Sequence, residues 1–292
     1  MDRLDVGQES FEFSYFNYTF LSVFNIIFVS VPSDNYKIYC INLEKEKLRK
    51  ERVTKLLSKD GLLSRSFFFK AICKDDIDED FMRSNGFEVF PDLYYEPLKR
   101  PWFLRGVNVG EIGCATSHYF CWKNFLDSDA DYAVFMEDDN FWDETGELKR
   151  EIENFIEFAE KDKTIDMVYF GRTRPDHWED VREEEEYSDN YLLADYSYNT
   201  HCYMLTRRGA EKIINQNPMK SIMPLDELLC SMFMDDHPHP HINKQFEANL
   251  KVLAIKNFDK YKDDDKYLGF CFQTMDEGMS KTDISDSDVY KS

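Results

Sequence analysis

The sequence predicts an α/β fold in which a Rossmann-like β-sheet lies between flanking helices. Two observations carry this prediction. Apolar runs of strand length alternate along the chain with segments of helical periodicity, and the first unit reads strand, helix, strand, which is typical of a parallel sheet. The 292 residues also include 42% hydrophobic residues, with 25 Phe and 17 Tyr, which is enough for a sizeable core.

The first half of the chain contains the opening strand-helix-strand unit and an acidic strand. A turn at 32–35 precedes the unit, and Gly61 stops its helix. Residues 74–108 are polar and punctuated by proline, which is typical of a long loop that grips a substrate. In order, the expected elements are a strand at 36–43, a helix at 44–59, a strand at 66–73, a helix at 111–125 and a strand at 131–139.

The second half continues the alternation of strands and helices. The expected elements are strands at 165–170, near 201–206 and at 251–256, and helices at 144–160, 207–215 and 227–234. We therefore expect one domain over 35–258, preceded by an apolar extension at 1–34 and followed by an acidic tail at 259–292. The tail is expected to pack in part through Phe270 and Phe272.

The apolar extension at 1–34 lacks the features of a signal peptide or a membrane span. It contains Glu12, Asn17 and Asn25, and acidic rather than basic residues precede its apolar part. We expect it to pack against the domain as a strand or helix, and a degenerate signal anchor is the alternative. The last residues, 290–292, do not form a retention signal.

Charge and cysteine content exclude several classes of protein. The chain carries 57 acidic against 36 basic residues, a formal net charge of -21. This balance argues against general binding to nucleic acid or to anionic membranes. The seven cysteines are an odd number, widely spaced and without a CxxC pair, so they predict buried thiols rather than a disulfide framework or a zinc site.

The strand at 131–139 is the most informative segment, because its apolar run ends in three carboxylates, Glu137, Asp138 and Asp139. In open α/β sheets, ligands bind beyond the carboxyl ends of the strands. Three adjacent anions repel one another unless a cation neutralises them, and oxygen ligands favour Mg²⁺, Mn²⁺ or Ca²⁺. The segment therefore predicts a divalent metal site, and a solvated turn is the alternative.

Several further blocks occur in one order along the chain. The upstream blocks are Ile41-Asn42-Leu43 with Arg49 and Arg52, Gly110-Glu111-Ile112-Gly113-Cys114, and Ser117-His118 with Trp122. The downstream blocks are 165–172, 194–198, 208–212, 223–227, Met232-Phe233, His237-Pro238 and 285–288. Together with the acidic strand, this series resembles glycosyltransferase family 25. Over about residues 36–288 it is similar to the C-terminal domain of procollagen galactosyltransferases.

The resemblance implies a GT-A fold, which is a nucleotide-sugar-binding α/β sheet, and inverting transfer of a hexose from a UDP-sugar. It also implies a divalent ion, Mn²⁺ or Mg²⁺, that bridges the UDP diphosphate and the acidic strand. Asp139 is expected to hold this ion together with Glu137, and Asp138 is the alternative to Glu137 and is otherwise expected beside the UDP-sugar. Asp259 stands where the family tends to have a Pro-Thr-His segment, and it is a further expected ligand.

The upstream blocks are expected to contact the UDP-sugar. Arg49 and Arg52 follow the first strand and suit bidentate contacts with the nucleotide or its phosphates, and surface ion pairs with Glu46 are the alternative. A lone histidine is often a satisfied structural residue, which is the alternative for His118. The remaining expected donor contacts are Asn42, Glu111 and Ser117.

Inverting displacement needs a carboxylate that takes the proton of the acceptor hydroxyl on the face opposite UDP. The resemblance assigns this role to Asp226, with Glu227 as the second candidate, and a helix N-cap is the alternative for Asp226. His237, His239 and His241 superficially suggest a transition-metal site. Because no cysteine or strict ligand spacing accompanies them, we expect a surface loop there.

The leading hypothesis is a metal-dependent transferase that moves a hexose, galactose by default, from a UDP-sugar to hydroxylysine in a collagen-like protein. The alternatives within this class are glucosyl transfer to galactosylhydroxylysine and transfer to lipopolysaccharide or another glycan. A binding or adhesion module that keeps the fold without catalysis is the alternative of another class. The resemblance implies the endoplasmic reticulum lumen, but the chain lacks the preceding domain and retention signal of the collagen enzymes, so a cytoplasmic location is also open.

Overall fold

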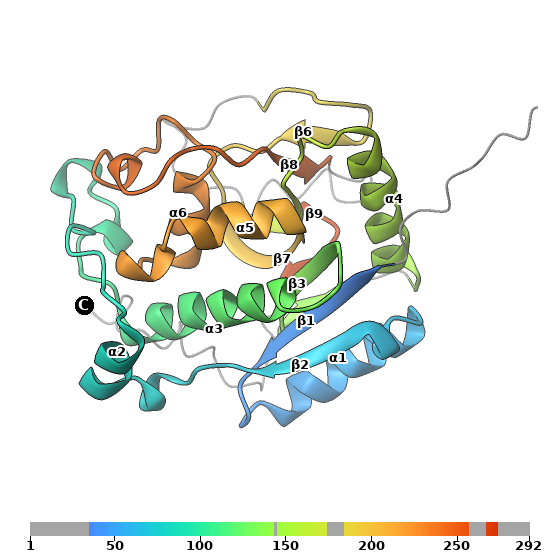
Figure 1. Ribbon diagram of the computed structural model, residues 1–292, viewed down its shortest axis with the longest axis horizontal. Coiled ribbons are helices and arrows are strands. Elements are labelled where there is room, and N and C mark those ends of the chain that lie inside the picture. The colour runs from blue at the N-terminus through green and yellow to red at the C-terminus, as the bar shows by residue number, and fades with distance from the viewer. Residues whose placement is uncertain (1–34, 143–144, 174–183, 257–266, 274–292) are drawn as a thin grey trace, which may run out of the picture. The chain divides into compact units, whose positions relative to one another are not determined.

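The structure is a computed structural model that describes residues 35–142, 145–173, 184–256 and 267–273. These residues form three layers, with a mixed β-sheet between two layers of helices (Figure 1). One layer contains α3 (Val109–Leu126), α5 (Arg207–Asn215) and α6 (Leu225–Ser231), and the other contains α1 (Lys47–Lys59) and α4 (Glu147–Lys161). The predicted α/β fold with flanking helices is confirmed.

Eight strands form the main sheet in the order β2, β1, β3, β7, β5, β8, β6, and β9 also pairs with β5. Their bounds are β1 Tyr36–Asn42, β2 Ser66–Lys70, β3 Tyr132–Glu137, β5 Met167–Thr173, β6 Tyr191–Leu193, β7 Tyr198–Thr206, β8 Val252–Ile255 and β9 Tyr267–Gly269. A separate pair consists of β4 (Asn140–Phe141) and β10 (Phe272–Gln273).

The sheet is mixed, with parallel pairs on both sides of β7, because β5 is also parallel to β8. β1 is parallel to β2 and β3, as predicted, but β7 is antiparallel to both β3 and β5. The prediction of a parallel sheet is therefore wrong at β7. Parallel neighbours need a crossover, usually a helix, whereas the described residues between β5 and β7 contain β6 and no helix.

Side chains of β3 alternate between the two helical layers. Ala133 and Phe135 pack with α3, α5 and α6, while Val134 and Met136 pack with α1 and α4. This alternation follows from the period of two along any strand. It continues to Glu137, the last residue of β3, whose carboxylate meets His118 of α3.

The predicted loop at 74–108 covers the layer that contains α6. It includes one short helix, α2 (Glu79–Asn85), and its Phe90, Leu93 and Phe103 are buried in the core of that layer. The backbone N–H of Phe90 donates to the carbonyl of Ile222, just before α6. The loop is therefore an ordered cover over one end of the sheet.

Residues 267–273, within the predicted tail, extend the sheet. A Cβ at Gly269, where φ is 104°, would lie 2.3 Å from the Phe170 carbonyl oxygen, so only glycine allows this close pairing of β9 with β5. The predicted packing of Phe270 is confirmed, because its side chain is fully buried against Phe170. The predictions for 1–34, for the Phe272 side chain and for the rest of the tail lie outside the described residues. Within the described part of the chain, no helix has the length and apolarity that a bilayer span requires.

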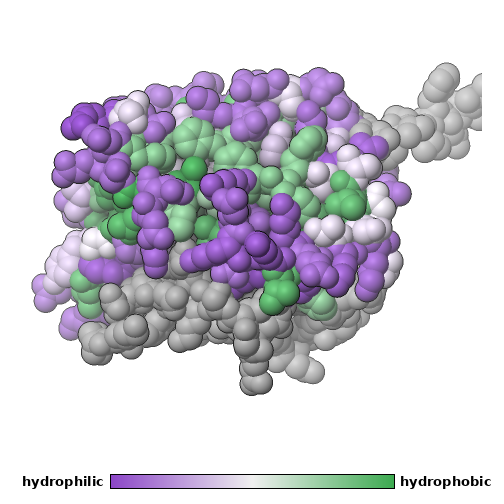
Figure 2. All heavy atoms as spheres, turned by 90° about the horizontal axis from the view of Figure 1, so that it is seen from below, coloured by the Kyte–Doolittle hydropathy of each residue, from purple (hydrophilic) through white to green (hydrophobic). Residues whose placement is uncertain are grey.

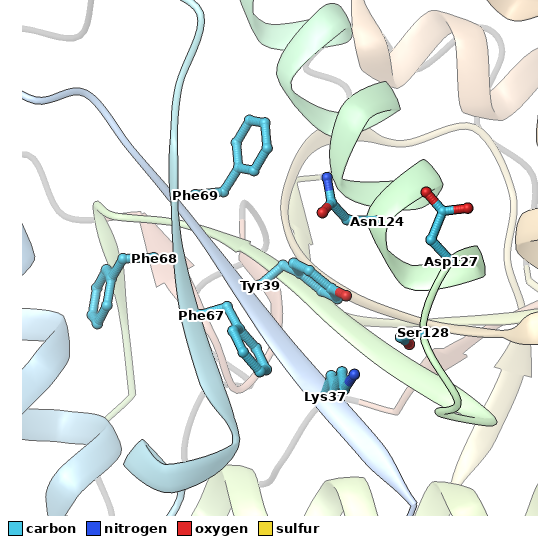
Figure 3. Close-up of a pocket in the computed structure, with 8 residues that line it drawn as sticks. All are labelled: Lys37, Tyr39, Phe67, Phe68, Phe69, Asn124, Asp127 and Ser128. Carbon is cyan, nitrogen blue, oxygen red and sulfur yellow. The ribbon is translucent and has the colours of Figure 1, made fainter.

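The edge strand β2 leaves aromatic surface exposed. Phe67 is 48% exposed, and the view from below in Figure 2 shows a band of hydrophobic surface between hydrophilic bands. A hollow of about 380 Å³ lies between β2 and the C-terminal end of α3 (Figure 3). None of the predicted site residues lines it. The lining residues are Lys37, Tyr39, Phe67, Phe68, Phe69, Asn124, Asp127 and Ser128.

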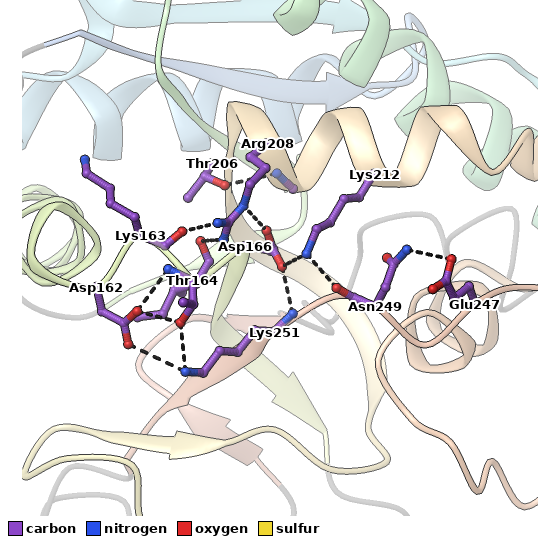
Figure 4. Close-up of polar contacts among 12 residues, drawn as sticks. Asp162, Lys163, Thr164, Asp166, Thr206, Arg208, Lys212, Glu247, Asn249 and Lys251 are labelled. Carbon is purple, nitrogen blue, oxygen red and sulfur yellow. Dashed lines mark hydrogen bonds and ion pairs between the residues drawn. The ribbon is translucent and has the colours of Figure 1, made fainter.

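A buried carboxylate ties α5 to the sheet (Figure 4). Asp166, just before β5, is fully buried, and its Oδ1 accepts a hydrogen bond from Arg208 Nε at 2.8 Å. Its Oδ2 accepts from Lys212 Nζ at 2.7 Å and from the backbone N–H of Lys251 at 2.9 Å. Because these donors come from α5 and from the segment before β8, one carboxylate joins three parts of the fold.

We expect Asp166→Ala to lower the free energy of unfolding by about 2–3 kcal/mol, because charge-assisted hydrogen bonds are lost while the partly exposed cations regain water. The urea midpoint at constant m measures this loss. Glu51→Ala removes an exposed ion pair with Lys55 and is the control that should leave the midpoint unchanged. Equal midpoints for wild type and Asp166→Ala would contradict the assignment.

Candidate functional site

The acids at the end of β3 face opposite helical layers. Glu137 meets α3, where its Oε1 lies 3.6 Å from His118 Nε2. Asp138 meets α1, where its Oδ1 lies 3.5 Å from Arg49 Nη1. The period of two along the strand separates the neighbouring side chains in this way. The acids therefore belong to two groups, which we name the α1 half-site and the α3 half-site.

The α1 half-site consists of Asn42, Arg49, Arg52, Asp138 and Asp139. Asn42 Nδ2 donates to Asp138 Oδ2 at 2.6 Å, and Arg52 Nη2 donates to the Asp138 carbonyl oxygen at 3.4 Å. Arg49 Nη1 also lies 3.7 Å from Asp139 Oδ2. Burial raises the pKa of Asp138 to about 6, although the hydrogen bond from Asn42 and the charge of Arg49 oppose the shift. The structure thus brings together, at the carboxyl ends of β1 and β3, four of the residues that were predicted to contact the UDP-sugar.

Two of the three predicted ligands of the divalent ion belong to the described residues, and they lie in different half-sites. Asp139 is buried in the α1 half-site, Glu137 lies in the α3 half-site, and Asp259 is outside the described residues. In the described part of the chain, one group of three or more Cys, His, Asp and Glu residues has its ligand atoms within 4.8 Å of one another. That group combines Glu137 with Cys114 and His118.

The α3 half-site consists of Cys114, His118, Glu137 and Asp226. Cys114 Sγ lies 3.7 Å from Glu137 Oε1, and His118 is fully buried with its Nδ1 2.8 Å from Tyr203 Oη. Burial alone would raise the pKa of Glu137, but His118, His201 and Cys114 together outweigh burial and hold that pKa below its usual value. His118 is therefore bonded within the core at one nitrogen and faces the carboxylate with the other.

Two other residues that were predicted to contact the UDP-sugar, Glu111 and Ser117, form hydrogen bonds within the fold. Glu111 and Asn108 form a capping box at the start of α3, and Glu111 Oε2 accepts from Arg105 Nη1 at 2.8 Å. Ser117 is buried, and its hydroxyl accepts the backbone N–H of Ile72 at 2.8 Å. These contacts fix the start of α3 and attach the helix to the segment after β2.

Asp226 lies in the first turn of α6, which packs against α3 and β7. Burial first, then the charges of Glu137 and Asp226, raise the pKa of the Cys114 thiol. The backbone N–H of Asn199 donates to Asp226 Oδ2 at 3.4 Å. Burial, followed by the charge of Glu227, raises the pKa of Asp226 to about 7.

The N-cap alternative for Asp226 is wrong. Pro224 occupies the cap position of α6, and the helix begins at Leu225, so Asp226 lies in the first turn. Its Oδ1 accepts the backbone N–H of Glu227 at 3.0 Å, which fixes the carboxylate beside the helix. Asp226 is thus held by backbone donors while its pKa is that of a base active near neutral pH.

Glu227, the second candidate base, is enclosed by the protein. It is 2% exposed, and the Tyr196 hydroxyl lies within hydrogen-bond distance of both of its oxygens, at 2.8 and 3.0 Å. His237 Nε2 lies 2.8 Å from Glu227 Oε2. Both carboxylate oxygens of Glu227 are thus engaged by side chains within the fold.

The predicted surface loop around the histidines is wrong for two of the three. His237 is 3% exposed and His239 is 0% exposed, while His241 is exposed. His239 Nε2 lies 3.0 Å from the carbonyl oxygen of Leu93, which belongs to the loop at 74–108. The loop cover therefore packs on His239, whereas His237 packs against Tyr196 and Glu227. Neither contact could be recognised from the local pattern of proline and polar residues.

Sequence reasoning did not assign roles to Tyr196, Asn199, Tyr203 and His237. Tyr196 and His237 lie in blocks that carried the resemblance, so their position in those blocks was the available signal. Asn199 has a positive φ of 60°, and Tyr203 lies in an apolar strand, neither of which marks a site in the sequence.

The sequence model of Glycosyltransferase family 25 (LPS biosynthesis protein) matches residues 35–229. That range contains both half-sites and Glu227. The chain therefore belongs to glycosyltransferase family 25.

Individual relatives agree with this membership. A Glycosyltransferase 25 family member from Anopheles gambiae is 32% identical over 225 residues, 74% of this chain and 35% of the relative. One from Aedes aegypti is 30% identical over 232 residues, 77% of this chain and 35% of the relative. Procollagen galactosyltransferase 2 from Homo sapiens is 27% identical over 225 residues, 75% of this chain and 34% of the relative.

The chain spans about a third of the length of the curated relatives it matches. Among solved structures, mannose-1-phosphate geranyltransferase from Thermus thermophilus superposes with a TM-score of 0.38 at 8% identity. The superposition covers 76% of this chain and 73% of that chain.

We expect Asp138→Asn to stabilise the metal-free protein by an amount that grows with pH. The pKa of Asp138 is about 6 in the fold against a usual 3.8. Ionisation therefore costs folding free energy as the pH rises between these values, up to about 2–3 kcal/mol. Urea unfolding in EDTA, compared at pH about 4 and about 7.5, measures the gap between variant and wild type.

Asp235→Asn is the control for this comparison, because Asp235 is exposed and outside both half-sites. Its midpoint should follow that of wild type at both pH values. If the difference in free energy of unfolding between Asp138→Asn and wild type is the same at both pH values, the assignment of the raised pKa to Asp138 is contradicted.

Proposed function

We propose that the protein is a glycosyltransferase that moves a hexose, galactose by default, from a UDP-sugar to hydroxylysine in a collagen-like protein. Membership of glycosyltransferase family 25 supports glycosyl transfer. The relatives named procollagen galactosyltransferase, from human and Xenopus laevis, support galactose and a collagen acceptor.

The observation that carries the proposal is that Asp226 lies in the first turn of α6, and this helix packs against α3 and against β7, the strand paired with β3. The α1 half-site begins at Asp138, the residue that follows β3, on the other face of the strand. A donor on the α1 side and an acceptor near Asp226 would meet at the carboxyl edge of the sheet, where α/β folds bind ligands.

The α1 half-site supplies the donor contacts in this proposal. Arg49 and Arg52 present guanidinium groups, which suit the oxygens of a diphosphate. Asn42 is buried at the end of β1 with its amide directed to Asp138. The UDP moiety would thus lie against groups that β1, α1 and β3 already hold in place.

The same half-site fits a hard divalent cation. Asp138 and Asp139 are 5% and 1% exposed, and their carboxylates offer the oxygen donors that Mn²⁺ and Mg²⁺ prefer. The pKa of Asp138, raised to about 6 by burial, reflects the cost of negative charge there, which a cation would relieve. We assign the ion to Asp139, and when bound it would stabilise the charge that gathers on the departing diphosphate.

Asp226 acts as the general base in the proposal. Its carboxylate takes the proton of the acceptor hydroxyl as that oxygen attacks the anomeric carbon, and UDP leaves with the electrons of the broken glycosidic bond. A pKa of about 7 gives a base that is strong and still substantially ionised at neutral pH. Glu227, held by Tyr196 and His237, keeps the first turn of α6 in position.

We expect Asp226→Asn to lower kcat by about 10²–10⁴-fold, because the amide cannot accept the hydroxyl proton. Wild-type kcat/KM should fall as the pH drops below about 7, where the carboxyl protonates, and the residual activity of the variant should lack this acid limb. Steady-state rates from pH 5.5 to 8.5, roughly 1.5 units either side of that pKa, test both points.

Asp235→Asn is the matched control, with full activity and an unchanged pH profile, because this exposed carboxylate is outside both half-sites. Full turnover by Asp226→Asn would remove Asp226 from the role of base. A wild-type profile without an acid limb near pH 7 would contradict the raised pKa.

We expect UDP release from UDP-galactose with hydroxylysine peptides to require Mn²⁺ or Mg²⁺ and to be lost in Asp139→Asn. Faster turnover of UDP-glucose with galactosylhydroxylysine would assign the glucosyl alternative, and turnover with lipopolysaccharide or another glycan would assign a different acceptor. Binding of the peptides without UDP release from any donor would indicate a binding module. Metal-independent turnover by Asp139→Asn would contradict the metal assignment.

A further inference from the structure

Cys114, His118 and Glu137 bring three different donor atoms to one point. Cys114 and His118 are four residues apart on α3, which places both on one face of the helix, and Glu137 ends the neighbouring strand β3. Their Sγ, Nε2 and Oε1 atoms all lie within 4.8 Å of one another. Glu137 Oε1 lies 3.7 Å from Cys114 Sγ and 3.6 Å from His118 Nε2.

The 3.6 Å separation of His118 Nε2 and Glu137 Oε1 matches that of two ligand atoms around a four-coordinate metal ion, and Cys114 Sγ, which donates to Glu137 Oε1 at 3.7 Å, lies close to this range. Zinc bonds of about 2.0–2.3 Å at tetrahedral angles hold their ligand atoms about 3.3–3.6 Å apart. A formed hydrogen bond between an imidazole N–H and a carboxylate would instead measure about 2.8 Å. The distance between His118 and Glu137 is therefore too long for a direct hydrogen bond and suits an atom bound between them.

The histidine supplies a second, independent observation. His118 is 0% exposed, yet its Nε2 has no hydrogen-bond partner among the described residues. Its Nδ1 lies 2.8 Å from Tyr203 Oη, and that oxygen also accepts the indole N–H of Trp122 at 2.9 Å. Metal-binding histidines are usually held at the second nitrogen in this way, which fixes the ring with its free nitrogen toward the ion.

We propose that Cys114, His118 and Glu137 form a binding site for Zn²⁺ or a similar borderline divalent ion. A thiolate, an imidazole and a carboxylate favour such an ion over Mn²⁺ or Mg²⁺, which prefer oxygen ligands alone. Binding releases the thiol proton of Cys114 to the solvent. This site lies on the opposite face of β3 from the α1 half-site, and its ion is separate from the ion assigned to Asp139.

The site has one open position. The Glu137 side chain is 23% exposed and Cys114 is partly exposed, so solvent reaches the cluster from the side of these two residues. Three protein ligands with a fourth position left free are the arrangement that binds water or a ligand oxygen. The fourth ligand is thus a water molecule or the hydroxyl oxygen of a ligand.

Cobalt is the probe that tests the site. The full chain, freed of metal with EDTA and kept reduced, should take up one equivalent of Co²⁺. A thiolate-to-cobalt charge-transfer band and the visible bands of a tetrahedral ion should appear, and Zn²⁺ should remove both. Cys114→Ser should abolish the charge-transfer band. His118→Gln and Glu137→Gln should weaken binding by about tenfold or more, since even outer partners of metal ligands contribute about 10–100-fold.

Two variants control for other thiols and for the other half-site. Cys73→Ser removes a partly exposed thiol outside the cluster and should leave the bands unchanged. Asp139→Asn should also keep them, so failure of the proposed transfer reaction and failure of this site are distinguishable. If Cys114→Ser does not fold, Tyr203→Phe keeps all three ligands and should still weaken Co²⁺ binding by about 10–100-fold. Absence of one-equivalent uptake by wild type, or a band that persists in Cys114→Ser, would overturn the proposal.

Discussion

The alternation of side chains along β3 is the constraint on which the arrangement of both half-sites depends. The same period that sends Phe135 into one core and Met136 into the other sends Glu137 toward α3 and Asp138 toward α1. A shift of one residue in the register of β3 would exchange these partners. The pairing of β3 with β1 and β7 therefore fixes the chemistry at its end as firmly as it fixes the hydrophobic core.

The buried carboxylates of Asp166 and Asp226 have different hydrogen-bond partners and different neighbouring charges. Asp166 receives hydrogen bonds from an arginine, a lysine and a backbone N–H, which neutralise it and hold α5 on the sheet. The hydrogen bonds to Asp226 come from backbone N–H groups, and its neighbours Glu227 and Glu111 carry like charge. A carboxylate in such surroundings keeps its basicity, which a proton-transfer role requires.

The sequence predicted those parts of the fold that depend on local periodicity. The strands β1 and β3, the helices α1, α3 and α5, and the acids at the ligand edge lie where their patterns placed them. The antiparallel β7 could not be predicted, because strand order depends on which distant segments pair. The burial of His239 was missed for the same reason, since the cover that packs on it comes from around Leu93, more than a hundred residues earlier.

The candidate site was likewise predicted in part, where its residues follow from neighbouring parallel strands, and mispredicted where closeness in the chain was taken for closeness in space. Asn42, Arg49 and Asp138 were predicted to contact one ligand, and they do lie together, because β1 and β3 are parallel neighbours whose carboxyl ends share one edge. Glu137 was grouped with Asp139 because the two are close in the chain, whereas the strand places it with Cys114 and His118.

The spacing of the cysteines could not indicate a zinc site, because the other two proposed ligands of Cys114 are not cysteines. They are His118, on the same helix, and Glu137, at the end of β3. The two faces of β3 consequently offer different ligands, oxygen atoms on the α1 side and mixed sulfur, nitrogen and oxygen atoms on the α3 side. Since ligand type governs which ion a site retains, one strand can separate two ions of different chemistry within a few residues of each other.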